Sequence, residues 1–439
     1  MLEQIRALIQ EEIKQYMATS TSSNVADSYG PAIFARQPVF NTAGKIWGYE
    51  LLYRRPSNQA SANVVRGAVA TAHVIVSGTE IASQGLTAGQ RLLINFPSDM
   101  IEAQIIQLLP KNICVLEILE DVIPTPEVLA AVADIKKAGY MIALDDFIGQ
   151  EQLRAFLPYA DIVKLEVLGL SDDEIRRNTL IAQKCNCTLL AEKTEDERIV
   201  KLCRELGYSL FQGYFFSKPE IVQGKKISTS QAARLNILAL CTGNDLDLKA
   251  LSEVILHDPL ITARLLKFIN SAHYSFSSPI NSVARALQLM GQVTIMQWLC
   301  INVLATLETN PISQEISFLA SQRAKFLENL GKALQTRNAL PNNISPSSLF
   351  LTGLFSLLES VIGVSIADAL EGVPLQKEVL DTLTGSPSPY TAWLQLMEIH
   401  DQGHWKLGLQ MGKALGINES DLSMAYTDAL KWSAAFFTR

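Results

Sequence analysis

The chain has 439 residues, more than one ordinary domain needs; 48% of them are hydrophobic and 18% are charged. This composition supplies sizeable apolar cores and excludes a globally disordered chain. With 37 Lys and Arg against 44 Asp and Glu, the net charge is −7. Because such an acidic chain lacks the broad positive surface that binds a nucleic-acid backbone, we expect no DNA binding. A small phosphorylated ligand stays compatible, since a bound metal ion can supply positive charge locally.

Cysteine spacing and hydropathy indicate a cytoplasmic protein without a membrane span. No two of the six cysteines have the two-residue spacing of a zinc or redox motif, which favours reduced thiols. The longest strongly apolar stretch, 349–358, is too short to cross a bilayer. Glu3, Glu11 and Glu12 interrupt the amino-terminal segment where a signal peptide needs an apolar run.

Residues 1–30 are predicted to form an amphipathic helix, over 2–17, and a polar linker. A single helix of this length is marginal in water and should pack on something. Packing on its own chain and docking on a partner or a second copy are equal alternatives.

From residue 31 to 226 the pattern alternates between strands and helices. Strand starts fall 20 to 28 residues apart over most of this region, the repeat of βα units, and two earlier strands are joined by a hairpin-like turn at 41–44. We therefore predict a (β/α)8-type barrel with an antiparallel start. The expected strands are 33–40, 45–53, 91–96, 113–119, 141–147, 161–167, 188–194 and 210–216.

Residues 227–439 lack strand-like alternation and are predicted to form an all-helical domain. Breaks are expected at Pro259, Pro279, Pro311, Pro341 and Pro374.

Polar side chains recur where the predicted barrel strands end. In a TIM-type barrel the carboxyl ends of the strands meet at one rim, where active sites are built. Carboxylates gathered there repel one another unless cations lie among them, and oxygen ligands suit Mg²⁺ or Mn²⁺. Two such ions would suit phosphodiester hydrolysis. The residues are Glu50, Asn95, Glu117, Asp145, Asp146, Lys164, Glu166, Glu192 and Gln212.

Residues 34–219 resemble the EAL domain, a fold that cleaves bacterial cyclic di-GMP. The order and spacing of the motifs carry this resemblance. They are Arg36-Gln-Pro-Val, Tyr49-Glu-Leu-Leu-Tyr-Arg54, Asn95-Phe-Pro, Leu116-Glu-Ile-Leu-Glu120, Leu144-Asp-Asp-Phe147, Val163-Lys-Leu-Glu166, Ala191-Glu-Lys-Thr-Glu195 and Phe211-Gln-Gly-Tyr-Phe-Phe-Ser-Lys-Pro219.

The resemblance implies a role for each site residue. Up to two Mg²⁺ or Mn²⁺ ions would be bound, and the nucleotide would be the substrate. The metal ligands would be Glu50, Asn95, Glu117 and Asp145 for the first ion, with Asp145 and Asp146 for the second. Lys164 and Glu192 would handle the attacking water and its proton, while Gln37, Arg54 and Gln212 would bind the substrate, Arg54 at a phosphate.

Three departures from the EAL pattern affect the expected activity. The segment Ile148-Gly-Gln-Glu-Gln152 replaces a Gly-Thr-Gly-Tyr-Ser-Ser-like loop that shapes the second metal site and the dimer contact in that family. Glu166 stands where aspartate is expected, and Lys193 where glycine is expected. Since a hydrolytic site tolerates little misplacement, slow turnover is expected.

The helical half resembles the HDOD domain, through residues 251–272 and 279–291. This module is related to HD phosphohydrolases but generally lacks their metal ligands. His257-Asp258 is interpreted as structural, with Asp258 capping a helix that Pro259 begins. Asn270-Ser271 of the same motif could serve a partner surface, but packing and capping are favoured. Five histidines in the whole chain are too few, at these spacings, for an HD-type centre.

The order of the two domains resembles YuxH-type bacterial signalling proteins. Two functions remain open. One is a signalling module whose partly degenerate EAL domain binds metal and cyclic di-GMP, with the HDOD domain contacting a partner protein. The other is an active metal-dependent phosphodiesterase that produces the linear dinucleotide. A homodimer is compatible with both.

Overall fold

The computed structural model describes residues 33–54, 64–84, 86–194, 196–213, 259–270, 279–307 and 311–437. Inter-residue contacts divide the chain into two compact units, the first containing the barrel and the second most of the helical half. The predicted amino-terminal helix and the pair His257-Asp258 lie outside the described residues.

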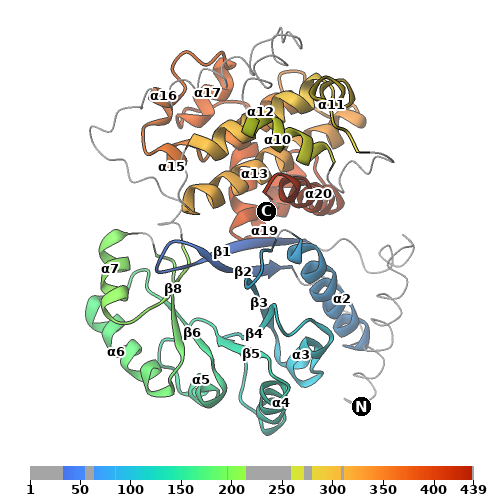
Figure 1. The fold of residues 1–439 in the computed structure, drawn as a ribbon. Helices are drawn as coiled ribbons and strands as arrows, with labels where there is room; N and C mark the ends of the chain where they lie inside the picture. Colours follow the sequence, from blue (N-terminus) through green and yellow to red (C-terminus); the bar gives the residue numbers. More distant parts are fainter. Residues whose placement is uncertain are drawn as a thin grey trace. The chain divides into compact units, whose positions relative to one another are not determined.

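The first unit contains a closed barrel of eight strands in sequential order (Figure 1). β1 pairs antiparallel with both β2 and β8, and the remaining neighbours pair in parallel. The predicted barrel with an antiparallel start is therefore confirmed. The strands are β1 (Phe34–Asn41), β2 (Ile46–Tyr53), β3 (Arg91–Phe96), β4 (Cys114–Ile118), β5 (Met141–Leu144), β6 (Ile162–Glu166), β7 (Thr188–Glu192) and β8 (Leu210–Phe211).

Five strands end earlier than expected, β4, β5, β6, β7 and β8, and the difference is largest in β5 and β8. β5 stops at Leu144 rather than at residue 147, and two residues later Asp146 has a φ of 42°, which an extended strand does not allow. β8 covers only Leu210–Phe211, and residues 214–216 lie outside the described residues. Both differences fall at the rim where polar side chains were expected.

Helices surround the barrel on its outer side (Figure 1). Several begin at side-chain caps: Thr125 precedes Pro126, Ser171 forms a capping box with Glu174, and Asp196 accepts from a backbone N–H of its helix. The helices are α2 (Val64–Ser83), α3 (Ser98–Glu102), α4 (Pro126–Lys137), α5 (Glu151–Arg154), α6 (Asp172–Ala182) and α7 (Glu197–Glu205), with 3-10 turns at Ile105–Leu108, Leu157–Tyr159 and Gln183–Cys185.

One apolar layer fills the barrel interior and fixes where the site lies. Because side chains alternate across a strand, the residue two positions further along each parallel strand also points inward, one layer nearer the carboxyl end. In β3, for example, Leu93 belongs to the layer and Asn95 follows it; in antiparallel β1 the order reverses, so Gln37 precedes Val39. The layer consists of Val39, Leu93, Val115, Ala143, Ile162, Leu190 and Leu210.

The described part of residues 227–439 is helical, and most of it belongs to the second unit, while residues 399–409 and 422–424 belong to the first. Helices α10 and α13 begin at Pro259 and Pro311, two of the predicted breaks, while Pro279, Pro341 and Pro374 lie in loops. The helices are α10 (Pro259–Ile269), α11 (Val283–Met290), α12 (Gln292–Leu307), α13 (Pro311–Thr336), α14 (Pro346–Phe355), α15 (Leu358–Ile362), α16 (Ile366–Ala369), α17 (Lys377–Leu383), α18 (Thr391–Asp401), α19 (Trp405–Ala414) and α20 (Glu419–Phe437).

Helices α13 and α14 approach so closely that a side chain would not fit between them at one point. A Cβ atom added to Gly353 would lie 2.7 Å from the backbone of Ala324. Within the described ranges, no single helix has the length and hydropathy to cross a membrane; α11 and α12 reach them only as a pair bent by 114°.

Candidate functional site

Lys164 lies at the centre of the strand ends, buried and surrounded by four carboxylates. Its Nζ is 2.8 Å from Glu192 Oε1, 2.9 Å from Asp145 Oδ1 and 3.2 Å from Glu50 Oε2, and it also donates to Glu117 Oε1. These groups come from β2, β4, β6 and β7 and from the residue after β5. The barrel therefore brings together side chains that are far apart in the sequence, as the strand-end pattern predicts.

The charges in this cluster do not balance. Burial raises the pKa of Glu117 and that of Glu192 well above their usual values, although the Lys164 charge opposes it. Burial alone would lower the pKa of Lys164, but the four carboxylates raise it well above its ordinary value. Despite burial, the ammonium holds the pKa of Asp145 below its usual value. One ammonium cannot neutralise four carboxylates, so further protons or cations are required.

Amide side chains complete the site beside Glu50. Asn95 Nδ2 donates to Glu50 Oε1 at 3.1 Å, and Gln212 Nε2 lies 2.7 Å from Glu50 Oε2. The same Gln212 nitrogen lies 3.0 Å from Gln37 Oε1. The Tyr53 hydroxyl donates to the Asn95 backbone oxygen at 2.5 Å. The predicted residues Gln37, Asn95 and Gln212 thus lie in one network with Glu50.

Four buried oxygen atoms of this cluster have no hydrogen-bond partner among the described residues. They are Asn95 Oδ1, Glu117 Oε2, Glu192 Oε2 and Gln212 Oε1. A buried acceptor without a donor is costly, and all four are the hard oxygen ligands that Mg²⁺ and Mn²⁺ prefer. The donor set therefore fits a divalent cation.

A second acidic cluster lies beside the first. Glu120, Asp145 and Asp146 each place a carboxylate oxygen within 4.8 Å of the others, and no other His, Cys, Asp or Glu group in the described ranges meets this spacing. Burial, together with the nearby Asp145 charge, raises the pKa of Asp146 to about 6. The sequence pattern assigns no role to Glu120. Its place three residues after Glu117, just beyond the end of a predicted strand, is the feature that could have identified it.

The altered loop at 148–152 is fastened by its own glutamines. Gln150 Nε2 donates to the Asp146 backbone oxygen at 2.9 Å, and Gln150 Oε1 accepts from Ile148 N at 2.7 Å. Gln152 Nε2 donates to the Glu120 backbone oxygen at 2.8 Å. The sequence predicts a loop that organises the second site poorly, whereas these bonds tie it to both Asp146 and Glu120.

The two single-residue departures from the EAL pattern pair with each other. Lys193 Nζ lies 2.5 Å from Glu166 Oε2, although the residues are far apart in sequence. Lys193 also has a φ of 51°, in the left-handed region that glycine adopts without strain. This backbone conformation explains why glycine is expected at the position.

Of the remaining predicted residues, Arg54 lies at the same rim, and part of the quoted motifs falls outside the residues that the structure describes. Arg54 is partly buried at the carboxyl end of β2, and its N–H bonds the Ile33 carbonyl oxygen. Residues 195 and 214–219 of the quoted motifs lie outside the described residues.

Chemically, the cluster offers a rim of oxygen ligands, one ammonium and two carboxyls with raised pKa values, those of Glu117 and Glu192. A carboxyl with a raised pKa can exchange a proton with a bound water. Such a site suits a phosphate ester bound through cations.

Residues 227–367 match the HDOD family model, described as the HDOD domain. YuxH of Bacillus subtilis (strain 168), an uncharacterised protein, is 31% identical over 406 residues, covering 91% of this chain and 97% of YuxH. The cyclic di-GMP phosphodiesterase CdgJ of Vibrio cholerae is 29% identical over 403 residues, covering 91% of each chain. Among solved structures, Bacillus subtilis YkuI, which has an EAL domain and contains c-di-GMP and calcium, is 18% identical, covering 62% of this chain and 75% of YkuI, with a TM-score of 0.37. So low a TM-score carries no argument.

Proposed function

This chain belongs to the YuxH family of EAL–HDOD proteins, and we propose that its barrel binds divalent cations and, through them, cyclic di-GMP. The closed barrel with an antiparallel start and the helical half containing the HDOD match confirm the predicted fold class. We also propose that residues 31–226 form the EAL-like domain and residues 227–439 the HDOD domain, after an amino-terminal segment of residues 1–30.

The observation that carries the proposal is the set of four buried oxygens around Lys164 for which the described part of the chain supplies no hydrogen-bond donor. Glu50, Asn95, Glu117 and Asp145 would hold the first ion. Asp145 and Asp146 would serve the second, and the nearness of Glu120 supports adding it as a third ligand. Bound ions would neutralise phosphate charge and lower the pKa of a water.

The remaining residues at the rim are placed where they could bind the nucleotide. Gln37 and Gln212 would bind the nucleotide beside Glu50, to which Gln212 is hydrogen-bonded. Arg54 would bind a phosphate, since a guanidinium can bond two oxygens of one phosphate.

A second candidate function is hydrolysis of cyclic di-GMP to the linear dinucleotide. Lys164 Nζ lies 2.8 Å from Glu192 Oε1 and 2.9 Å from Asp145 Oδ1, so the groups proposed to orient the water and move its proton are in contact. The name of the relative CdgJ agrees with this function. Because the 148–152 loop and Glu166 depart from the EAL pattern, the partly degenerate signalling module with slow turnover remains the first proposal.

For the helical half we propose protein binding without hydrolase activity. Within the described part of this half, no group of His, Cys, Asp and Glu has the mutual spacing of a metal site. A partner contact through the HDOD domain, a contribution of the amino-terminal helix, homodimer formation and a cytoplasmic location are further parts of the proposal.

Calorimetry of the full chain with Mn²⁺, followed by cyclic di-GMP, tests the binding proposal. We expect Mn²⁺ binding that Glu50→Ala abolishes and that Glu205→Gln, an exposed acid on α7, leaves unchanged. Nucleotide binding should require the metal. Mn²⁺ binding unaffected by Glu50→Ala would overturn the site assignment.

Chromatography of the incubated nucleotide separates the two candidate functions. Binding with little linear product supports the signalling module. Rapid production of the linear dinucleotide, lost in Glu192→Ala, would establish the phosphodiesterase instead. If the protein neither bound nor cleaved cyclic di-GMP, both candidate functions would be wrong.

A further inference from the structure

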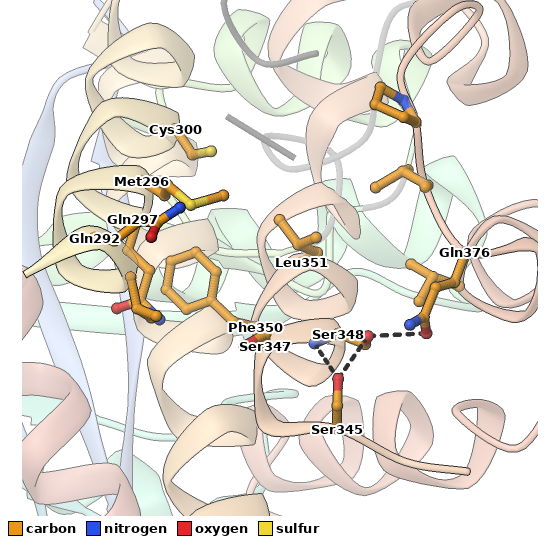
Figure 2. A pocket seen from close by; sticks show the side chains of 14 residues that line it. Gln292, Met296, Gln297, Cys300, Ser345, Ser347, Ser348, Phe350, Leu351 and Gln376 are labelled. Carbon is orange, nitrogen blue, oxygen red and sulfur yellow. Dashed lines mark hydrogen bonds between the residues drawn. The ribbon is translucent and has the colours of Figure 1, made fainter. Parts of the chain in front are cut away.

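A hollow of about 680 Å³ lies in the helical unit, between α12, the first turns of α14 and the segment before α17 (Figure 2). Its volume is within the range of small-molecule sites. Every lining residue belongs to the second unit, so the hollow is independent of the barrel site.

No Asp, Glu, Lys, Arg or His side chain lines this hollow. Its apolar surface comes from Met296 on α12, Phe350 and Leu351 on α14, and Val379 on α17. Phe350 and Val379 are buried and form its inner part. A charged ligand would lose its hydration here without gaining a counterion, so the surface favours an uncharged one.

Two glutamines in the lining have amides that the surrounding contacts orient. Gln297 Nε2 donates to the buried Glu328 Oε1 at 2.9 Å, which uses one of its two hydrogens and orients the amide, and no described residue donates to its carbonyl oxygen. Gln376 Oε1 accepts from Ser348 Oγ at 2.9 Å, and it shares the hydrogen of the Tyr390 hydroxyl, 3.3 Å away, with the Asn343 carbonyl oxygen at 3.4 Å. Its acceptor is therefore satisfied, and its NH₂ group remains as the donor.

The two amides come from different elements, Gln297 from α12 and Gln376 from the residue before α17, and Figure 2 shows them on either side of Leu351. The side chains of Gln292 and Ser347, which also line the hollow, are exposed and have no hydrogen-bond partner within the described ranges. The hollow thus combines apolar walls with one oriented acceptor, one oriented donor and two further adaptable polar groups.

We propose that this hollow binds an uncharged, planar nitrogen heterocycle of the nucleobase type. Such a ring presents apolar faces to Phe350 and Leu351 while its edge carries both an N–H donor and a carbonyl or ring-nitrogen acceptor. Gln297 receives the N–H and Gln376 donates to the acceptor. A rigid ring also loses less conformational freedom on binding than a flexible chain with the same groups.

Guanosine titrated into the full chain in EDTA tests the proposal, because chelation removes the cations on which the barrel site is proposed to depend. We expect saturable binding by calorimetry, no binding of ribose, and affinity for guanosine 5′-monophosphate no higher than for guanosine. Gln376→Leu should weaken guanosine binding at least tenfold. Leu351→Trp, which fills the hollow, should abolish it.

Gln335→Leu on α13 is the matched control, an exposed glutamine outside the hollow, and should bind like the parent protein. Gln376→Glu keeps the shape of the side chain but removes the donor, and should behave like Gln376→Leu. Absence of guanosine binding, binding unchanged by both Gln376 variants, or much tighter binding of the phosphorylated compound would overturn the proposal.

Discussion

In the part of the chain that the structure describes, each unit contains a buried ion-pair cluster, around Lys164 in the barrel and around Glu328 in the helical unit, and the charges of the two are balanced differently. In the helical unit Glu328 accepts from Gln297 and from two lysines, Lys325 at 2.8 Å and Lys332 at 2.5 Å. In the barrel, one lysine, Lys164, faces four carboxylates. Glu328 and Lys164 are buried to a similar degree, but the buried acid is surrounded by cations and the buried cation is surrounded by acids.

The difference appears in the acids themselves. Despite burial, the two lysines and Gln297 hold the pKa of Glu328 below its usual value, so it stays ionised. Burial raises the pKa of Glu117, and one oxygen each of Glu117 and Glu192 has no hydrogen-bond partner among the described residues. A cluster satisfied by its own chain stabilises a fold, whereas one left with surplus carboxylates is suited to bind a cation.

The largest expected effect is the loss of stability on removing the Lys164 ammonium from the centre of the barrel cluster. Without metal, Lys164→Met leaves four buried carboxylates with no positive charge, which should cost about 3–5 kcal/mol of stability. Calorimetric melting in EDTA measures this, and added Mn²⁺ should recover part of the loss.

Lys136→Met is the control, because the Lys136–Asp161 pair is partly exposed and is worth at most about 1 kcal/mol. A melting temperature of Lys164→Met equal to that of this control would show that the barrel cluster carries no surplus charge.

Removing one carboxylate from each cluster should have opposite consequences. Glu328→Gln removes the counterion of two lysines and should destabilise the protein by about 2–3 kcal/mol, with or without Mn²⁺. Glu117→Gln relieves repulsion, so the metal-free protein should be as stable as the parent or more stable. Its Mn²⁺ affinity should fall at least tenfold.

Thermal melting of both variants in EDTA, together with Mn²⁺ titration, distinguishes the two clusters. If Glu117→Gln destabilised the metal-free protein as strongly as Glu328→Gln does, the contrast between a structural and a cation-binding cluster would be wrong.

The sequence predicts the strands and the rim well because both depend on local periodicity. Alternation of two residues and a repeat of βα units are visible in the chain, and they place Glu117 and Glu192 at strand ends whatever the details of packing. The same periodicity places Lys164 at a strand end. It does not predict that the Lys164 ammonium contacts four carboxylates, because those contacts exist only in the closed barrel.

Features that depend on side chains of distant segments were missed. That Gln150 and Gln152 fasten the altered loop depends on where the backbone of Asp146 and Glu120 lies. The pairing of Lys193 with Glu166 likewise joins two departures that looked independent in the sequence. Comparison with the EAL pattern alone treats such changes as losses, whereas in this chain the substituted side chains form hydrogen bonds and an ion pair.

A smaller effect is expected in the pH dependence of the second cation. A proton on Asp146 competes with a metal ion, and the pKa of this carboxyl is about 6, raised by burial and by the Asp145 charge. Affinity at this site should therefore rise between pH 5 and 7, as the carboxyl loses its proton. Mn²⁺ titrations across this range measure it, and Asp146→Asn should remove the dependence while lowering affinity. A flat profile in the parent protein would exclude Asp146 as a ligand.

The smallest effect concerns Lys193, which opposes that rise in the Asp146 pKa. Lys193→Met removes the charge but keeps a side chain at the φ of 51°, so the pKa of Asp146 should rise and the pH midpoint of Mn²⁺ binding should move upward. Lys193→Gly removes the charge and also relieves about 1 kcal/mol of backbone strain. Both variants should therefore show the same shifted midpoint, and only the glycine variant should gain stability. A midpoint that moves in neither variant would show that the Glu166–Lys193 pair is confined to the surface and has no influence on the cation site.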